Sequence, residues 1–272
     1  MGAPVSVDAA WLKERLESGG GNICLFDTAF LAPNSVELYA ADHIPTALHL
    51  DLNQIKNDSD LVRNHPSHPL IFEEYLQKKG VNRTCHVVLY DHGEKFENRK
   101  SIMSATFAYW LFKVFGHDQV SLLKDGLSGW KSNNFSTTNR VETVGRRGNF
   151  KASWNMNEIA TFCDVVDNFE SNEWLIFDTR PSPKERIKGS INLPIPDLLT
   201  EENLLKPLPL LQSLVTERGI TGEKPVITQC GTGFSATVLY FVLKQLDIPT
   251  KVYSGSWFEW SQRAPKDLIE QV

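Results

Sequence analysis

Short apolar runs alternate along this chain with longer stretches in which apolar residues recur at helical spacing. In the first half, the runs predict strands at 23–26, 86–90 and 120–123, and the longer stretch predicts a helix at 101–115. The second half repeats the order, with predicted strands at 174–177, 225–228 and 251–253 and a predicted helix at 235–246. Strands that alternate with helices are typical of a parallel sheet with crossover helices, so the pattern predicts an α/β fold.

The two halves also share local sequence. Leu25-Phe26-Asp27-Thr28 matches Ile176-Phe177-Asp178-Thr179, and the stretch Gly126–Trp130 is similar to Ser256–Trp260. Between the halves, residues 132–148 are rich in Asn, Ser, Thr, Gly and Arg and show little periodicity. We therefore expect two tandem copies of one domain, each a parallel sheet with helices on both faces. Their expected ranges are 1–135 and 152–272, with a linker over 136–151.

Composition narrows the functional classes. The 272 residues include 28 basic and 33 acidic ones, for a net charge of −5, so the chain has no overall basic field to attract nucleic acid. The sequence contains no run of about 18 uncharged apolar residues, so it predicts no membrane-spanning helix. The N-terminus shows no secretory or organellar pattern, although its start at Gly2 fits the loose myristoylation motif. We expect a cytoplasmic protein.

The four cysteines are widely spaced, at Cys24, Cys85, Cys163 and Cys230. Because none forms a C-x-x-C pair, the spacing argues against a zinc site or a disulfide framework and favours a reducing compartment. We expect the Pro-rich stretch 64–69, with its two histidines, to be a loop and not a metal site.

The most informative segment is Cys230-Gly231-Thr232-Gly233-Phe234-Ser235, between a predicted buried strand and an apolar helix. Ligands of open α/β sheets bind at this end of the strands, and two glycines allow successive N–H groups to converge on one anion. With the helix N-terminus, such a cluster stabilises a thiolate. Thr232 and Ser235 add hydroxyl donors. The pattern thus favours Cys230 as a nucleophile over Cys230 as a small packing residue.

Two other uses of such a loop are weaker. A cysteine phosphatase needs an arginine six residues after its cysteine, where this chain has Ala236. The string Gly231–Ala236 also imitates the dinucleotide fingerprint G-x-G-x-x-A. That motif expects an acidic residue about 20 positions on, where this chain has Tyr253-Ser254-Gly255. Dinucleotide binding remains the weaker alternative.

These features resemble the two-domain rhodanese family, and within it the mercaptopyruvate type. The resemblance rests on four motifs: the Cys230–Gly233 loop, His43-Ile44-Pro45, Val114-Phe115-Gly116-His117 and Gly255–Trp260. It implies two rhodanese domains, with Asp91 at the inactive position of the first. It also implies sulfur transfer from 3-mercaptopyruvate through a Cys230 persulfide to cyanide or a thiol such as thioredoxin, without a metal or organic cofactor. A thiosulfate sulfurtransferase and a catalytically weak sulfur-carrier or binding module are the alternatives.

The resemblance also assigns roles residue by residue. Thr232 takes the place of the family's loop serine, and His43 matches a histidine that approaches the loop from the first domain. Arg180 matches an Asp-x-Arg element that braces the loop. Of two arginines that grip the substrate carboxylate in the family, one aligns with Phe107 and the other with Lys184. Nearby cations are Arg186, Arg99 and Lys100. The expected substrate-binding residues are Gly231, Gly233, Phe234, Ser235, Lys184 and Arg186.

Overall fold

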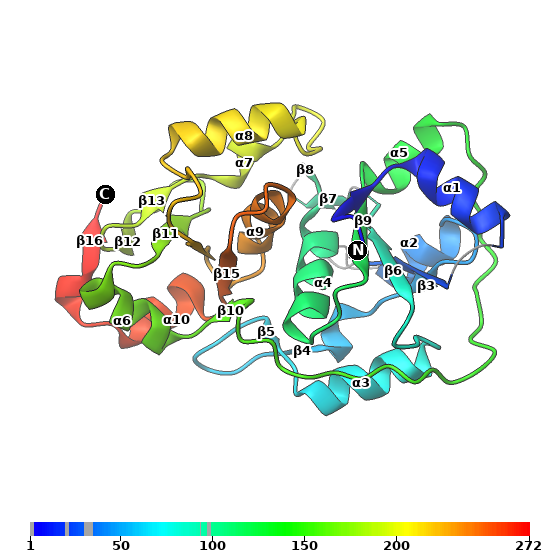
Figure 1. Cartoon of the computed structure of the whole chain (residues 1–272), viewed down its shortest axis with the longest axis horizontal. Coiled ribbons are helices and arrows are strands. Elements are labelled where there is room, and N and C mark those ends of the chain that lie inside the picture. The colour runs from blue at the N-terminus through cyan, green and yellow to red at the C-terminus, as the bar shows by residue number, and fades with distance from the viewer. Residues whose placement is uncertain (1–2, 20–21, 30–34, 93, 97–98) are drawn as a thin grey trace. The chain divides into compact units, whose positions relative to one another are not determined.

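The computed structural model describes residues 3–19, 22–29, 35–92, 94–96 and 99–272, and the motif at Gly2 lies outside them. The chain forms two compact units (Figure 1). Unit 1 contains Met1–Ile55, Ser67–Trp154 and Glu201–Leu204; unit 2 contains Lys56–Pro66, Asn155–Thr200 and Leu205–Val272. The two units are therefore not continuous in sequence, because each contains one short segment from the other half of the chain. The larger of these segments, residues 56–66 of the first half, belongs to unit 2.

Unit 1 is built on a parallel sheet which, within the described residues, has five strands in the order β1-β9-β6-β2-β3. Their bounds are β1 (Ser6–Val7), β2 (Ile23–Asp27), β3 (Leu48–His49), β6 (His86–Tyr90) and β9 (Val120–Leu123). The helices are α1 (Ala9–Glu17), α2 (Ser35–Ala41), α3 (Pro69–Lys78), α4 (Met103–Val114) and α5 (Gly126–Ser132), with a 3₁₀ turn η1 (Leu52–Gln54). β7 (Glu94–Phe96) and β8 (Arg99–Ser101) pair as antiparallel strands.

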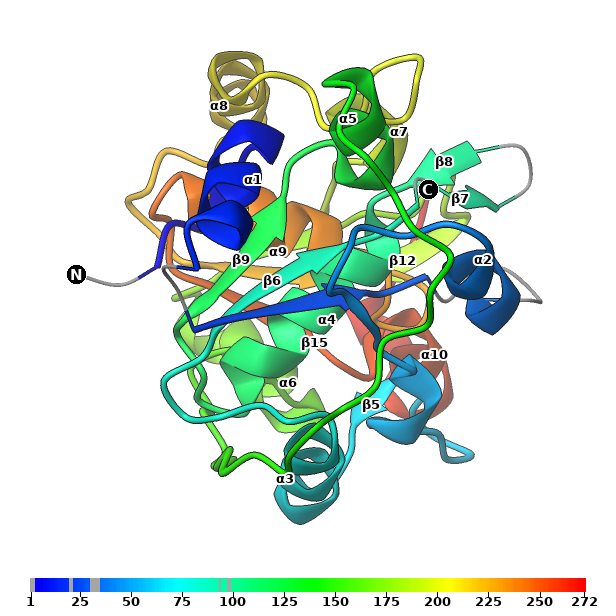
Figure 2. The same cartoon turned by 90° about the vertical axis from the view of Figure 1, so that its right-hand side faces the viewer.

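Helices cover both faces of this sheet (Figure 2). On one face, Leu12 of α1 and Trp130 of α5 pack in one apolar cluster with Leu25 and Val88 of the strands. On the other face, α4 contacts β6 and β9. Two faces buried against helices explain why the strands read as continuous apolar runs.

Unit 2 repeats the arrangement. Within the described residues its parallel sheet has the order β10-β15-β14-β11-β13. The bounds are β10 (Ile159–Ala160), β11 (Leu175–Asp178), β13 (Ile191–Asn192), β14 (Val226–Gln229) and β15 (Thr250–Tyr253). The helices are α6 (Phe162–Ser171), α7 (Ile195–Leu198), α8 (Leu208–Glu217), α9 (Ala236–Gln245) and α10 (Ser256–Arg263), with a 3₁₀ turn η2 (Lys266–Leu268). Two antiparallel pairs complete it: β4 (Lys56–Asn57) with β5 (His65–Pro66), and β12 (Glu185–Ile187) with β16 (Ile269–Gln271).

The α/β class and the duplication are confirmed. Each strand of the five-stranded sheet of unit 1 has a counterpart at the same place in the sheet of unit 2, so that β6 corresponds to β14 and β2 to β11. The predicted strands and helices lie within a few residues of the observed ones. Edge strands such as β3 and β13 have two residues each, too short to show a period of their own. Of the helices in the described residues, none has the length and apolarity needed to cross a bilayer.

The predicted linker is irregular but firmly attached to unit 1. The N–H of Gly148 donates to the Gln77 carbonyl at 2.8 Å, and the N–H of Phe150 donates to the Val81 carbonyl at 3.0 Å. The Phe150 ring is buried against Phe72. These contacts hold residues 148–150 in place although they form no helix or strand.

Cys24 and Cys85 form a disulfide, which corrects the expectation of no disulfide framework. Their Cα atoms are 5.9 Å apart, and the two residues are separated by 61 positions in the sequence. The strands β2 and β6 are neighbours, and their register pairs Cys24 with Val87, close to Cys85. The cysteine spacing concealed the pair because adjacency in a parallel sheet follows from strand order and not from sequence distance. The cysteines therefore do not indicate a reducing compartment.

This crosslink gives a stability prediction. Because it closes a long loop between two strands, we expect its removal by Cys24→Ala with Cys85→Ala to lower the free energy of unfolding by about 2–4 kcal/mol. Thermal unfolding of both proteins, with and without reductant, measures this effect. Reductant should lower the midpoint of the parent protein and leave that of the double variant unchanged. Four titratable thiols in the unfolded, unreduced parent would show that the bond does not form.

Candidate active site

Cys230 lies at the carboxyl end of β14, the central strand of the unit 2 sheet. The residue is 2% exposed and its thiol is free. The loop that follows runs from Gly231 to Ser235, and α9 begins at Ala236. The expected strand–loop–helix placement is confirmed.

Helix α10 holds the beginning of this loop. The backbone N–H of Trp257 donates to the Cys230 carbonyl at 3.0 Å, and that of Phe258 donates to the Gly231 carbonyl at 2.8 Å. The Cys230 N–H donates to Ser256 Oγ at 3.2 Å, while the same hydroxyl donates to the Tyr253 carbonyl at 2.8 Å. The carbonyls of Cys230 and Gly231 are therefore satisfied by the first turn of α10.

The N–H groups of the loop itself are different. Those of Gly231, Thr232, Gly233 and Ser235 have no hydrogen-bond acceptor among the described residues. Ser235 takes the N-cap position of α9, yet its hydroxyl makes no capping bond. Four unengaged donors at the start of an apolar helix form a site suited to an anion, such as a thiolate or persulfide at Cys230.

The two glycines of the loop have different structural roles. Gly233 has φ +82°, and a Cβ there would lie 2.5 Å from the Ser254 carbonyl oxygen. A Cβ added at Gly231 would meet no atom within 4 Å. Gly233 is therefore required by the backbone, whereas at Gly231 there is open space. The loop residue Phe234 is mostly buried, and its predicted contact with substrate stays a prediction.

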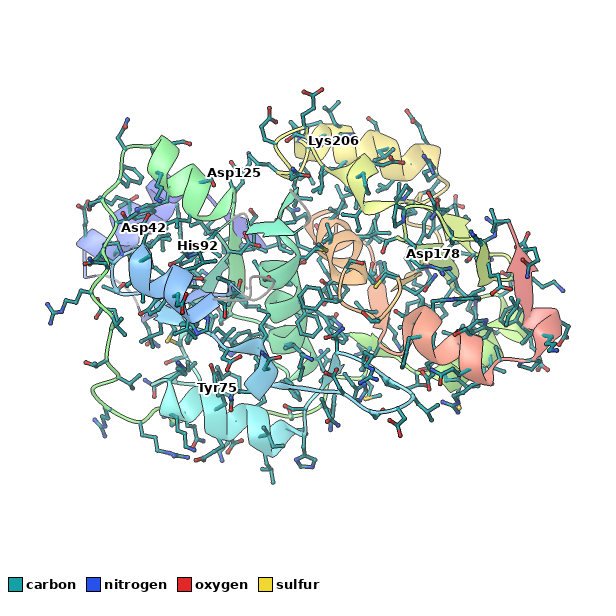
Figure 3. The ribbon with its side chains drawn as sticks, turned by 180° about the vertical axis from the view of Figure 1, so that it is seen from behind. Asp42, Tyr75, His92, Asp125, Asp178 and Lys206 are labelled. Atoms are coloured by element: carbon teal, nitrogen blue, oxygen red, sulfur yellow. A yellow bond between two sulfur atoms is a disulfide. The ribbon has the colours of Figure 1, made fainter. Side chains whose placement is uncertain are left out.

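A buried ion pair braces the site from β11 (Figure 3, where Asp178 is labelled). The Arg180 side chain donates to both carboxylate oxygens of Asp178, with Nε at 3.0 Å from each, and to the Glu185 carbonyl at 2.7 Å. Its guanidinium lies 4.5 Å from the ring centroid of Trp257. Since Trp257 also holds the Cys230 carbonyl, Arg180 supports the loop through the start of α10.

Asp91 takes the place of Cys230 in unit 1. It directly follows β6, the counterpart of β14, and its carbonyl accepts from the Leu127 N–H at 3.0 Å. The bond from Trp257 to Cys230 is the equivalent in unit 2. Unit 1 therefore carries the same loop support with a carboxylate in place of the thiol.

His43 lies in unit 1 and is fully buried. Its Nδ1 is 2.6 Å from the Tyr39 carbonyl, and the Tyr39 ring stacks on it at 4.1 Å between centroids. Because a carbonyl only accepts, Nδ1 carries a proton and donates it. Nε2 has no partner among the described residues. His43 is thus held as an oriented imidazole with one free nitrogen, and its action on the loop stays a prediction.

The predicted carboxylate-binding cations have different surroundings. Lys184 is exposed, and its ammonium has no acidic partner in the described part of the chain. Arg186, on β12, forms a two-pronged ion pair with Glu270 of β16, at 3.1 and 3.0 Å, which raises the pKa of the guanidinium. Arg186 therefore secures the C-terminal strand, and it would bind substrate only if that pair opened.

Three further positions named for carboxylate binding lie in the first half of the chain. Phe107, which aligns with a family arginine, is buried within α4. Arg99 and Lys100 lie on β8, and their side chains fall outside the part of the structure that is described.

Three residues near Cys230 were not predicted. Ser254 precedes Gly255, Ser256 is the first residue of α10, and Asn64 comes from the hairpin of β4 and β5. Ser256 has φ +50°, which no sequence pattern indicates for a serine. The similarity between Gly126–Trp130 and Ser256–Trp260 indicated that this turn matters, but it did not identify the two serines as contacts of the loop. Asn64 had none, because it reaches the loop from 168 residues away.

Comparisons with known proteins agree with this geometry. A family model described as a rhodanese-like domain matches residues 8–133 and 162–263. The chain is 29% identical over 278 residues to the 3-mercaptopyruvate sulfurtransferase of Escherichia coli (strain K12), with 95% of each chain covered. It is 27% identical over 282 residues to the thiosulfate sulfurtransferase of Bos taurus, covering 96% of this chain and 93% of the relative. The crystal structure of the 3-mercaptopyruvate sulfotransferase SseA from Escherichia coli superposes with a TM-score of 0.80 at 28% identity, covering 94% of this chain and 99% of that one.

The family match falls on both halves of the sequence and includes every described strand of the two five-stranded sheets except the edge strands β1 and β10, together with the Cys230 loop and its counterpart at Asp91. Together with the duplicated sheet order, it shows that this chain belongs to the family of rhodanese-like domain proteins.

Proposed function

We propose that this protein is a sulfurtransferase that takes sulfur from 3-mercaptopyruvate onto Cys230, releases pyruvate and passes the sulfur to cyanide or a thiol. The observation that carries the proposal is the free thiol of Cys230 beside four loop N–H groups without acceptors in the described residues. The similarity to a 3-mercaptopyruvate sulfurtransferase over 95% of the chain supports the choice of donor.

The first half-reaction forms a persulfide. The Cys230 thiolate attacks the donor sulfur, and an S–S bond forms as the C–S bond breaks. The bonding pair passes to carbon as the enolate of pyruvate, which takes up a proton to give pyruvate. The loop N–H groups stabilise negative charge on the thiolate before this step and on the outer sulfur after it. Thr232 supplies a hydroxyl donor for the charge that develops on the substrate oxygen.

The second half-reaction regenerates the thiol. An acceptor thiolate attacks the outer sulfur, the S–S bond to Cys230 breaks, and Cys230 leaves as a thiolate. Cyanide in the same role gives thiocyanate. We also propose a cytoplasmic location and a protein thiol such as thioredoxin as acceptor, because each cycle must begin with Cys230 reduced. No metal or organic cofactor takes part in these steps.

Lys184 is the proposed partner of the substrate carboxylate, with the loop donors of Gly231, Gly233 and Ser235. Lysine keeps the positive charge of the family's arginine but loses its two-pronged geometry. Phe234 and Arg186 complete the proposed binding set, Arg186 only with its bond to Glu270 broken. His43 is proposed to exchange protons through its free Nε2.

Two variants distinguish these cations. We expect Lys184→Ala to raise the KM for 3-mercaptopyruvate by about tenfold, as expected for the loss of a charged contact, without lowering the unfolding midpoint. Arg186→Ala should lower the midpoint by detaching β16 and change KM little. Steady-state kinetics and thermal unfolding of both variants measure the difference. A KM effect confined to Arg186→Ala would reverse the assignment.

Donor preference tests the function as a whole. Initial rates of pyruvate release from 3-mercaptopyruvate are compared with thiocyanate release from thiosulfate and cyanide. We expect the higher kcat/KM with 3-mercaptopyruvate, because the loop carries no basic side chain for a doubly charged donor. A higher value with thiosulfate would favour the alternative that the Bos taurus relative represents. No turnover with either donor would favour a sulfur carrier or binding module.

A further inference from the structure

A segment from the first half of the chain lies against the catalytic loop within unit 2. Strands β4 and β5 form a hairpin in which Asn57 is opposite His65. Asp58 secures its turn, accepting from the Asn64 backbone N–H at 2.7 Å and from Lys56 Nζ at 2.7 Å. The expectation of a loop over 64–69 is therefore wrong in part, because His65–Pro66 form β5 of an ordered hairpin and Pro69 begins α3.

Three side chains of this hairpin contact the surroundings of Cys230. Asn64 Nδ2 lies 3.1 Å from Thr232 Oγ1 and 3.4 Å from the Thr232 carbonyl oxygen. His65 Nδ1 lies 2.8 Å from Ser254 Oγ. The Arg63 guanidinium carbon lies 5.2 Å from the centroid of the Phe258 ring. Each partner belongs to the structure that shapes the loop, since Ser254 limits the space at Gly233 and Phe258 holds the Gly231 carbonyl.

The contact with Thr232 settles the orientation of the Asn64 amide. A backbone carbonyl can only accept a hydrogen bond, so the amide group that faces it must be the NH₂. The same NH₂ is within reach of Thr232 Oγ1, which therefore also accepts. A hydroxyl that accepts from Asn64 keeps its own proton for another acceptor.

We infer that Asn64 is a positioning residue for the sulfur-transfer reaction: it directs the Thr232 hydroxyl to act as a donor toward the ligand at Cys230. The inference rests on the proposed function. During C–S cleavage negative charge collects on the carbonyl oxygen of the departing pyruvate enolate, and a donor fixed in advance stabilises that charge. Asn64 touches no reacting atom and acts only through Thr232.

Asn64→Asp is the sharpest variant. Aspartate has nearly the same shape and, like asparagine, tolerates the left-handed φ of +52° at this position. It replaces the donating NH₂ with an accepting carboxylate oxygen, so that the Thr232 hydroxyl donates to it and the direction of the bond is reversed. We expect kcat with 3-mercaptopyruvate to fall at least about tenfold, with KM changed less than about twofold.

The matched control is Asn57→Asp, which makes the same chemical change at an exposed position of the same hairpin. We expect its kcat to equal that of the parent protein. Asn64→Gly removes the amide without straining the backbone and gives a second test should the aspartate variant unfold. We expect it to lower kcat less than Asn64→Asp does, because it removes the donor to the Thr232 hydroxyl without supplying a competing acceptor.

A double-mutant cycle separates positioning from a simple charge effect. In a Thr232→Val background, Asn64→Asp should cost little further activity, and in a Thr232→Ser background it should still cost about tenfold. An equal loss in the Thr232→Val background, or a parent-like Asn64→Asp protein, would overturn the inference while leaving the proposed function intact. A parent protein silent with both 3-mercaptopyruvate and thiosulfate would overturn the proposed function, and the inference with it.

Discussion

Cys230→Ser is expected to lower turnover by more than about a thousandfold, because it removes the only sulfur that the mechanism allows to form the persulfide. The serine hydroxyl occupies the same place at the end of β14 but is not ionised near neutral pH. The fold should persist, since the carbonyl and N–H of residue 230 keep their bonds to α10. Pyruvate release measures the loss, and the unfolding midpoint shows that the variant is folded.

Cys163→Ser is the matched control for this prediction. Cys163 is the second free cysteine among the described residues, and it is exposed on α6. We expect its loss to leave turnover at the level of the parent protein. Substantial activity in Cys230→Ser, or a comparable loss in Cys163→Ser, would remove Cys230 from its central role.

Gly233→Ala is expected to have the second largest effect. The substitution meets a left-handed φ of +82° and a carbonyl oxygen 2.5 Å from the new Cβ. Conformational strain and overpacking each cost about 1–3 kcal/mol, so we expect unfolding free energy to fall by about 3 kcal/mol. Because the loop must move to admit the Cβ, its N–H groups lose their arrangement, and turnover should fall by about a hundredfold or more.

Gly231→Ala is the matched control, because it also replaces a loop glycine with alanine but leaves the loop backbone unstrained. Its Cβ meets nothing within 4 Å, so we expect unfolding free energy to change by less than about 0.5 kcal/mol. Any effect should fall on KM, because the methyl group enters the space open to the substrate. Denaturant unfolding and steady-state kinetics of both variants test the contrast. Equal destabilisation by the two substitutions would contradict the roles assigned to them.

The sequence predicts best what is local. A strand, Cys-Gly-Thr-Gly and a helix are adjacent in the chain, so the position of Cys230 and of the loop donors follows from periodicity and glycine placement. The repeat between the halves shows in short stretches of each copy and predicts two copies of one α/β unit. The structure shows that the two sheets also have the same strand order.

What the sequence could not predict depends on contacts between distant segments. The bond from Asn64 to Thr232 spans 168 residues, and the pair of Arg186 with Glu270 spans 84. Lys184 and Arg186 look alike as charges in one short stretch, yet only the packing of β16 on β12 distinguishes them. The Cys24–Cys85 disulfide likewise depends on strand order, which cysteine spacing does not reveal.

The most direct test of the central claim is the intact mass and peptide map of the protein after 3-mercaptopyruvate is added without an acceptor. The account predicts one added sulfur atom on the peptide that contains Cys230, with one pyruvate released for each sulfur bound. Cyanide or a thiol should then remove that sulfur. Pyruvate release with no sulfur adduct, or sulfur bound at Cys163 in place of Cys230, would contradict the account.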